Sequence, residues 1–122
     1  MIKQALLGVT LTFSLATLAA PVQVTETPHG DILTDEAGMS LYVFDQDAPG
    51  VSNCNDQCAV NWPPLAATTE DQAEGDYGVV TRADGKLQWS YKGQPLYLWL
   101  KDKAPGDTTG DGVNNVWHLA RP

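Results

Sequence analysis

Short apolar stretches alternate with turn residues along the chain, and the same order of stretches occurs twice. In each copy the pattern predicts a first strand, over residues 22–26 and 77–81, and a second strand, over residues 31–35 and 86–91. The turn between the two strands ends in glycine in both copies and also contains proline or aspartate, residues that readily reverse a chain. The sequence therefore predicts one antiparallel hairpin in each copy.

A third strand is predicted where the copies are most alike, in "LYVFDQD" and "LYLWLKD". Because side chains alternate across a strand, Tyr42 and Phe44 lie on one face, and Leu41 and Val43 lie on the other. Residues 96–99 repeat this arrangement. Both faces are apolar, so we expect this strand to be central in the fold and covered on both sides.

A single spacing of 55 positions relates the two copies at many points. The pairs at this spacing are Gly30 with Gly85, Gly38 with Gly93, Leu41 with Leu96, Tyr42 with Tyr97, Asp47 with Asp102, and Trp62 with Trp117. A spacing shared by so many positions indicates a duplication. The chain length then suits a single domain over residues 20–122, made of two repeats at about 22–65 and 77–122.

The connector between the repeats, residues 66–76, is acidic and lacks strand periodicity, and it could hold a helical turn capped by Thr68 or Thr69. Each repeat ends in a tryptophan segment. Residues 117–119 can form a fourth strand, whereas two prolines stop the chain from doing so after Trp62. Two such units are too few for a propeller. We predict an all-β fold: a compact, pseudo-symmetric antiparallel structure of two repeats, either a sandwich or a part-closed barrel, with long loops.

The first 19 residues have the pattern of a secretory signal peptide, with Lys3 before an apolar stretch and small residues at a cleavage site after Ala19. The apolar stretch is too short and too polar to span a membrane. The formal net charge is −8, and removal of Lys3 with the leader leaves −9. This acidity argues against nucleic acid or an anionic membrane surface as a partner. We expect a soluble protein in the periplasm or outside the cell, with an unidentified cell-envelope ligand or protein as its partner.

The third-strand stretch resembles a bacterial family of secreted repeats of unknown function, which is defined by a tandem Tyr-x-(Phe/Trp/Tyr)-x-x-Asp motif. The motif stands here as Tyr42-Val43-Phe44-Asp45-Gln46-Asp47 and as Tyr97-Leu98-Trp99-Leu100-Lys101-Asp102. The segments "SNCNDQCAVNWPPL" and "GVNNVWHLARP" also resemble the ends of the family's repeats. Many members are lipoproteins, but no cysteine follows the expected cleavage site here. The resemblance implies a fold and a secreted location, and it implies no activity.

The motif residues themselves favour a structural role. The aromatic residues at its first and third positions fill a core by the strand argument, and Asp47 and Asp102 lie just past the strand, where a carboxylate accepts hydrogen bonds from turn amides. A functional alternative follows from the pseudo-symmetry. If the copies pack about a twofold axis, the two aspartates could converge on one cleft and hold a cation.

Cys54 and Cys58 predict a disulfide, because an exported protein meets an oxidising environment. The alternative is a copper(I) site in which the two thiolates are joined by His118 or His29, and by Met39.

The loop "DTTGDGVNN" resembles the start of a calcium-binding loop. Asp107, Thr109 and Asp111 stand at alternate positions, but His118 replaces the closing glutamate. The alternative is a solvated turn.

Known catalytic motifs for nucleophilic, phosphate or metal-dependent chemistry are absent from the sequence. The expected mature part keeps all four tryptophans and all four tyrosines, and those outside the core could stack on sugar rings or on an apolar ligand. We therefore expect a binding or interaction module that is not an enzyme and needs no cofactor. Metal binding, to copper or calcium, is the alternative.

Overall fold

The computed structural model describes residues 20–122, and the expected signal peptide, residues 1–19, lies outside them. The elements in chain order are β1 (Val22–Thr27), β2 (Gly30–Asp35), β3 (Tyr42–Phe44), α1 (Gln57–Asn61), β4 (Ala66–Ala67), β5 (Tyr77–Thr81), β6 (Leu87–Tyr91), β7 (Gln94–Pro95), the 3-10 turn η1 (Val113–Asn115) and β8 (Trp117–Leu119). The fold is thus all-β, with one short helix in the described part, which is too short and not apolar enough to cross a membrane.

Both predicted hairpins are present. β1 pairs with β2 in antiparallel register from Val22 opposite Asp35 to Thr27 opposite Gly30. β5 pairs with β6 in the same way in the second repeat. Gly30 has a φ of 94°, a conformation that glycine adopts without the steric cost that other residues pay, and it closes the tight turn of the first hairpin.

The two motif segments meet at the centre of the molecule. The amide of Tyr42 donates to the carbonyl of Tyr97 at 2.8 Å, and the amide of Tyr97 donates back to the carbonyl of Tyr42 at 3.0 Å. The first copy forms strand β3 as predicted, whereas the second copy makes only isolated bridges, to Tyr42 and to Pro64. The next residue along, Pro63, accepts a hydrogen bond from Leu98 but has no amide hydrogen to return one, so the ladder on that side ends there.

Each motif segment is flanked by the end of the other repeat. β8 pairs with β3, with Phe44 opposite Trp117, which confirms the predicted fourth strand. On the other side the amide of Leu98 donates to the carbonyl of Pro63 at 2.7 Å. The two repeats therefore exchange their final segments across the pseudo-twofold axis, and neither repeat completes its own central layer.

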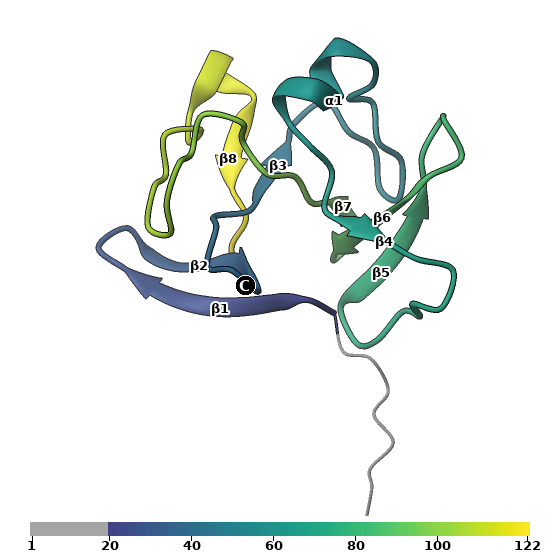
Figure 1. Ribbon diagram of the computed structural model, residues 1–122, viewed down its shortest axis with the longest axis horizontal. Coiled ribbons are helices and arrows are strands. Elements are labelled where there is room, and N and C mark those ends of the chain that lie inside the picture. The colour runs from purple at the N-terminus through teal and green to yellow at the C-terminus, as the bar shows by residue number, and fades with distance from the viewer. Residues whose placement is uncertain (1–19) are drawn as a thin grey trace, which may run out of the picture.

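The central layer separates two apolar clusters. Its aromatic face joins the buried residues Ile32, Tyr42, Cys54, Trp62, Tyr97, Trp117 and Leu119. Its aliphatic face joins Leu33, Leu41, Val43, Leu65, Trp89, Leu96 and Ala120. The alternation predicted for the third strand is thus confirmed in both copies. The sheets do not close into a barrel, and a sandwich is the predicted alternative that the arrangement fits (Figure 1).

The connector between the repeats differs from the expectation. Ala66–Ala67 forms strand β4, which pairs with β6. No helical turn follows, because the amide of Thr68 is bound by the side chain of Asp71 at 2.7 Å and the chain reverses there in a turn. The hydroxyl of Thr68 accepts the amide of Glu70 at 3.3 Å, as a helix cap would, but the chain forms a turn there and no helix. The one α-helix within residues 20–122 is α1 (Gln57–Asn61), which precedes the connector (Figure 1).

Candidate functional site

The tyrosine of each motif binds the aspartate of the other motif. The phenol of Tyr42 donates to Oδ2 of Asp102 at 2.6 Å, and the phenol of Tyr97 donates to Oδ2 of Asp47 at 2.7 Å. The second oxygen of each carboxylate accepts a backbone amide from the following loop, that of Thr109 at 3.0 Å for Asp102 and that of Asn53 at 2.7 Å for Asp47. The amide contacts were expected from the sequence. The exchange of partners between repeats was not.

The two aspartates do not share a hydrogen-bond partner, so each belongs to a separate pair on its own side of the axis. Within residues 20–122 there is also no group of three or more histidine, cysteine, aspartate or glutamate side chains placed to hold a metal ion. The sequence-based alternative, in which Asp47 and Asp102 converge on one cation site, therefore has no geometry to support it in this part of the chain.

The Tyr42–Asp102 pair is buried and accepts hydrogen bonds from the loop that follows Asp102. The phenol oxygen of Tyr42 accepts the amide of Gly110 at 3.1 Å, and the hydroxyl of Thr109 donates to Asp102 at 2.6 Å. Burial, followed by the hydrogen bond to Asp102, raises the pKa of Tyr42 well above its usual value of 10.0. A β-carbon on Gly110 would come within 2.9 Å of the rings of Tyr42 and Trp62, so this close approach requires glycine.

The Tyr97–Asp47 pair belongs to a longer network. The single phenol hydrogen of Tyr97 is donated to Asp47, so the hydroxyl of Ser52, 2.6 Å away, donates to the phenol oxygen. Arg82 in turn donates to Ser52 at 3.0 Å, and also to Oε1 of Gln88 at 2.7 Å. Burial raises the pKa of Tyr97 and of half-buried Asp47, and the charge of Arg82 opposes the shift at Asp47.

Four aromatic rings form a continuous stack across the axis. The order is Phe44, Trp117, Trp62 and Trp99, with ring centroids 4.2, 3.8 and 3.9 Å apart and neighbouring planes within 23° of parallel. We refer to these four rings as the aromatic column. The two inner rings are buried, and the two outer rings, which are the third residues of the motifs, are partly exposed. The expectation that Phe44 and Trp99 face the core with the motif tyrosines agrees with this packing.

The two tyrosines contact the column edge-on. The ring of Tyr42 lies 5.4 Å from that of Trp62 at 77°, and the ring of Tyr97 lies 5.1 Å from that of Trp117 at 90°. Edge-to-face contacts of this kind are favourable because the positive ring edge meets the negative ring face. Every aromatic and acidic position of the repeated motif is therefore used in one assembly at the centre of the molecule.

Cys54 and Cys58 form a disulfide, as predicted, and the described chain has no free cysteine. Sulfurs bonded to each other do not supply the thiolates that a copper(I) site requires. The copper alternative that used these cysteines is therefore wrong for this form of the protein.

The other candidate metal ligands are dispersed among local hydrogen bonds. Asp107 accepts the amides of Lys103 and Ala104, and Asp111 accepts the amide of Leu119. His118 lies on β8 and bonds with its Nε2 to Asp45 at 2.7 Å, in an exposed pair.

Met39 and Thr109 also have other hydrogen-bond partners, and His29 lies exposed in the turn between β1 and β2. Met39 lies in the turn after β2, where its amide donates to Asp35. Thr109, the middle residue of the expected calcium loop, is bound to Asp102. The loop thus holds the Tyr42–Asp102 pair in place through hydrogen bonds. Within residues 20–122 these candidate ligands do not come together in one metal site.

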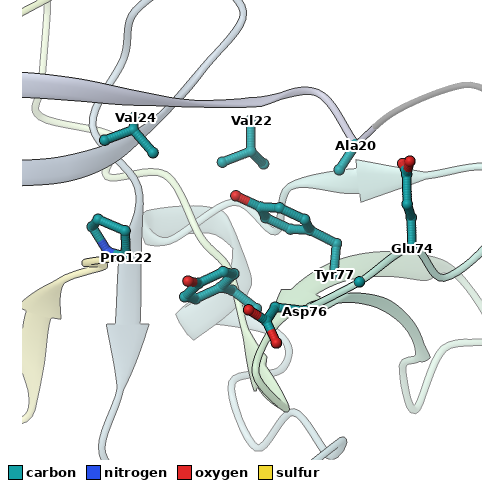
Figure 2. Close-up of a pocket in the computed structure, with 9 residues that line it drawn as sticks. Ala20, Val22, Val24, Glu74, Asp76, Tyr77 and Pro122 are labelled. Carbon is teal, nitrogen blue, oxygen red and sulfur yellow. The ribbon is translucent and has the colours of Figure 1, made fainter.

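A cleft of about 400 Å³ lies at the seam of the two repeats, between β1 and the β5–β6 hairpin (Figure 2). Its lining residues are Ala20, Val22, Val24, Glu74, Gly75, Asp76, Tyr77, Tyr91 and Pro122. The rings of Tyr77 and Tyr91 lie 5.0 Å apart and are tilted by 48°. Burial, and then the nearby Tyr91 and Asp76, raises the pKa of Tyr77. We refer to this space as the seam cleft.

Sequence reasoning did not find the seam cleft, because its residues come from both repeats, the connector and the C-terminal end. One signal was present: Tyr77 and Tyr91 stand at the ends of predicted strands, where the corresponding residues of the first repeat, Val22 and Glu36, are not aromatic. An aromatic pair that occurs in one repeat and has no counterpart in the other indicates a surface feature of that repeat alone.

Comparison with known proteins adds a family to this description. A search of the curated proteins and a search of the solved structures each gave no match. A family model described as "Secreted repeat of unknown function" matches the chain twice, over residues 23–66 and 78–121. The two matches coincide with the two motif-bearing repeats and together cover most of the sequence. The chain therefore belongs to this family of secreted repeats of unknown function.

Proposed function

We propose that the protein is a non-catalytic binding module that acts in the periplasm or outside the cell, and that it binds its ligand in the seam cleft. The observation that carries this proposal is the position of Tyr77 and Tyr91. Most of the chain's tyrosines and tryptophans are buried in the two apolar clusters. These two tyrosines pack against the aliphatic cluster on one side, but they are partly exposed and meet at the edge of a cleft of ligand size.

The lining of the seam cleft favours a ligand with apolar ring faces and hydrogen-bond donors. Tyr77, Tyr91 and the aliphatic side chains of β1 supply flat and apolar contacts, and Val24 is 55% exposed. Glu74 and Asp76 supply acceptors at the same rim. The charged side chains that line the cleft, Glu74 and Asp76, are both acidic and disfavour an anionic ligand. A glycan of neutral or amino sugars combines the required features.

The same residues support a role without catalysis. No histidine, cysteine, serine or threonine lines the seam cleft, and its two carboxylates, Glu74 and Asp76, lie exposed at the rim, whereas a glycosidase encloses the scissile bond between two carboxyl groups. The paired carboxylates of the motifs lie elsewhere, where each is occupied by a tyrosine and a backbone amide.

Titration with β-1,4-linked oligomers of N-acetylglucosamine and of glucosamine, followed by isothermal calorimetry, tests the proposal. We expect at least one series to bind, and the Tyr77→Ala variant to weaken binding several-fold, because one aromatic contact contributes about 1 kcal/mol. Val60→Ala, which truncates an exposed apolar side chain on α1 away from the cleft, is the control and should leave affinity unchanged. Absence of binding to either series, or equal affinity in the Tyr77→Ala variant, would contradict the proposal.

A further inference from the structure

The aromatic column and the two tyrosine–aspartate pairs form one connected assembly at the pseudo-twofold axis. We propose that this assembly is a one-electron relay, in which an oxidising equivalent accepted at Trp99 passes through Trp62 to the motif tyrosines. The substrate class is one-electron oxidants such as oxygen-centred radicals. This inference does not depend on the seam cleft, which contributes no residue to the column.

The ring geometry supplies a continuous path. Trp99 contacts Trp62, and Trp62 contacts Trp117, with centroids 3.9 and 3.8 Å apart. Rings at this separation are in van der Waals contact, and electron transfer is fastest between π systems that touch. Indole is also the most easily oxidised of the aromatic side chains, apart from a phenol that can release its proton. Three indoles in series therefore make an oxidation at one end available at the axis.

The partly exposed end of the column sets the direction. Trp99 is accessible to an oxidant in solution, whereas Trp62 and Trp117 are buried. The other end of the column is Phe44, whose ring is much harder to oxidise. Each of the two buried indoles is next to one motif tyrosine, Trp62 to Tyr42 and Trp117 to Tyr97, with centroids 5.4 and 5.1 Å apart. The path therefore ends at the tyrosines.

The hydrogen bonds to the aspartates complete the chemistry. A phenol that loses an electron becomes strongly acidic, so its oxidation is easy only where a base can take the proton. Asp102 Oδ2 lies 2.6 Å from the phenol oxygen of Tyr42, and Asp47 Oδ2 lies 2.7 Å from that of Tyr97. Each phenol already donates its hydrogen to the carboxylate that would receive the proton.

At the first pair the oxidation proceeds in three one-electron transfers. The oxidant gains one electron, and Trp99 becomes a radical cation. Trp62 returns an electron to Trp99, and Tyr42 returns one to Trp62. In the last step the O–H bond of Tyr42 breaks: its electron goes to the indole, its proton forms an O–H bond on Asp102, and Tyr42 remains as a neutral phenoxyl radical. The second pair reacts in the same way through Trp117.

The chain offers a clean background for testing this relay. It contains four tyrosines, and the double variant Tyr77→Phe, Tyr91→Phe leaves only the buried Tyr42 and Tyr97. In this background a ruthenium(III) tris-bipyridine complex, generated by a light flash with a sacrificial electron acceptor, serves as the oxidant. Transient absorption and freeze-quench electron paramagnetic resonance then distinguish indole radicals from phenoxyl radicals.

We expect an indole radical to form first and a phenoxyl radical to follow in the double variant. Adding Trp99→Phe should remove most of the phenoxyl signal. The control is Trp89→Phe, which removes a buried indole of the other apolar cluster and should leave the signal intact. Each variant is first shown to be folded by near-ultraviolet circular dichroism.

Two outcomes would overturn the relay: indole radicals that decay without any phenoxyl signal, or an undiminished phenoxyl signal after Trp99→Phe. A further measurement separates a relay from an aromatic core that only packs. Replacing the acceptors, with Asp102→Asn and Asp47→Asn together, should slow phenoxyl formation while the indole radical still forms. An unchanged rate of phenoxyl formation in a folded Asn variant would count against the proton transfer and hence against the proposal.

Discussion

The phenol of Tyr42 lies 2.6 Å from Asp102 and the phenol of Tyr97 lies 2.7 Å from Asp47, but the groups around these two contacts differ. Around the first pair the additional donors are Thr109 and the amide of Gly110, both from the adjacent loop. Around the second pair the additional donors are the amide of Asn53, from the adjacent loop, and the hydroxyl of Ser52, which connects the phenol to a buried arginine.

This difference shows which part of the site each stretch of sequence controls. The duplicated motif places the tyrosine and the aspartate, so both pairs have nearly the same direct contact. The loop after each motif differs between the copies, and it decides whether the pair is closed by local backbone groups or connected to a charge. Two copies of a duplicated unit can therefore keep the same tyrosine–aspartate contact while the chemical environment of that contact differs between them.

The largest expected effect on stability comes from removing the positive charge of Arg82, which is connected to the Tyr97–Asp47 pair and has no equivalent at the Tyr42–Asp102 pair. Arg82 is 4% exposed and donates to Ser52, Gln88 and the carbonyl of Cys54. Arg82→Met keeps much of the volume but leaves these buried acceptors without a donor. We expect it to lower the free energy of unfolding by about 3 to 5 kcal/mol, measured by urea denaturation.

Arg121→Met is the matched control for this substitution. Arg121 is exposed and donates to the carbonyls of His29 and Asp31, so its loss should cost less than about 1 kcal/mol. If the two variants lose equal stability, the buried network does not distinguish the second pair from the first.

An intermediate effect is expected from the phenols themselves. Tyr42→Phe leaves buried Asp102 without its phenol donor and the Gly110 amide without its acceptor, at a cost of about 2 to 3 kcal/mol. Tyr97→Phe should cost about 1 to 2 kcal/mol, because half-buried Asp47 can bind water instead and the hydroxyl of Ser52, which loses its acceptor, can rotate. Urea denaturation measures both. Tyr91→Phe, whose phenol makes no hydrogen bond within residues 20–122, should change stability by less than about 0.5 kcal/mol. Equal losses for the two motif tyrosines would contradict the asymmetry inferred for the pairs.

Much of the fold could be predicted from the sequence because the repeat provided two independent copies of each pattern. The alternation around Tyr42 gave the central strand and its two apolar faces, and the prolines after Trp62 explained why only the second repeat adds a full fourth strand. The reciprocal pairs could not be predicted, because periodicity shows which face a tyrosine occupies and not which repeat lies opposite it. Arg82 was not found for a similar reason: it stands in a predicted surface turn, and only the packing of the first repeat's loop buries it.

The smallest expected effect is the pH dependence of stability that arises from the carboxyl group of Asp47. Burial raises the pKa of Asp47 above its usual value of 3.8, and the hydrogen bond from Tyr97 acts in the opposite direction. The folded state therefore holds this proton more tightly than the unfolded state does. The resulting stabilisation is fully present below pH 3.8 and is lost as the pH rises through the folded-state pKa.

Carboxyl-resolved nuclear magnetic resonance should place the titration midpoint of Asp47 above 3.8 in the native protein, and higher still in Tyr97→Phe, which loses a donor that favours the carboxylate. Relative to Asp47→Asn, the native protein should lose about 1 kcal/mol or less of stability as the pH rises through this midpoint, since the asparagine does not titrate. A midpoint at or below 3.8 would mean that Tyr97, Asn53 and Arg82 outweigh burial. The second pair would then stabilise the charged carboxylate relative to the unfolded chain, through the amide of Asn53, the phenol of Tyr97 and the charge of Arg82.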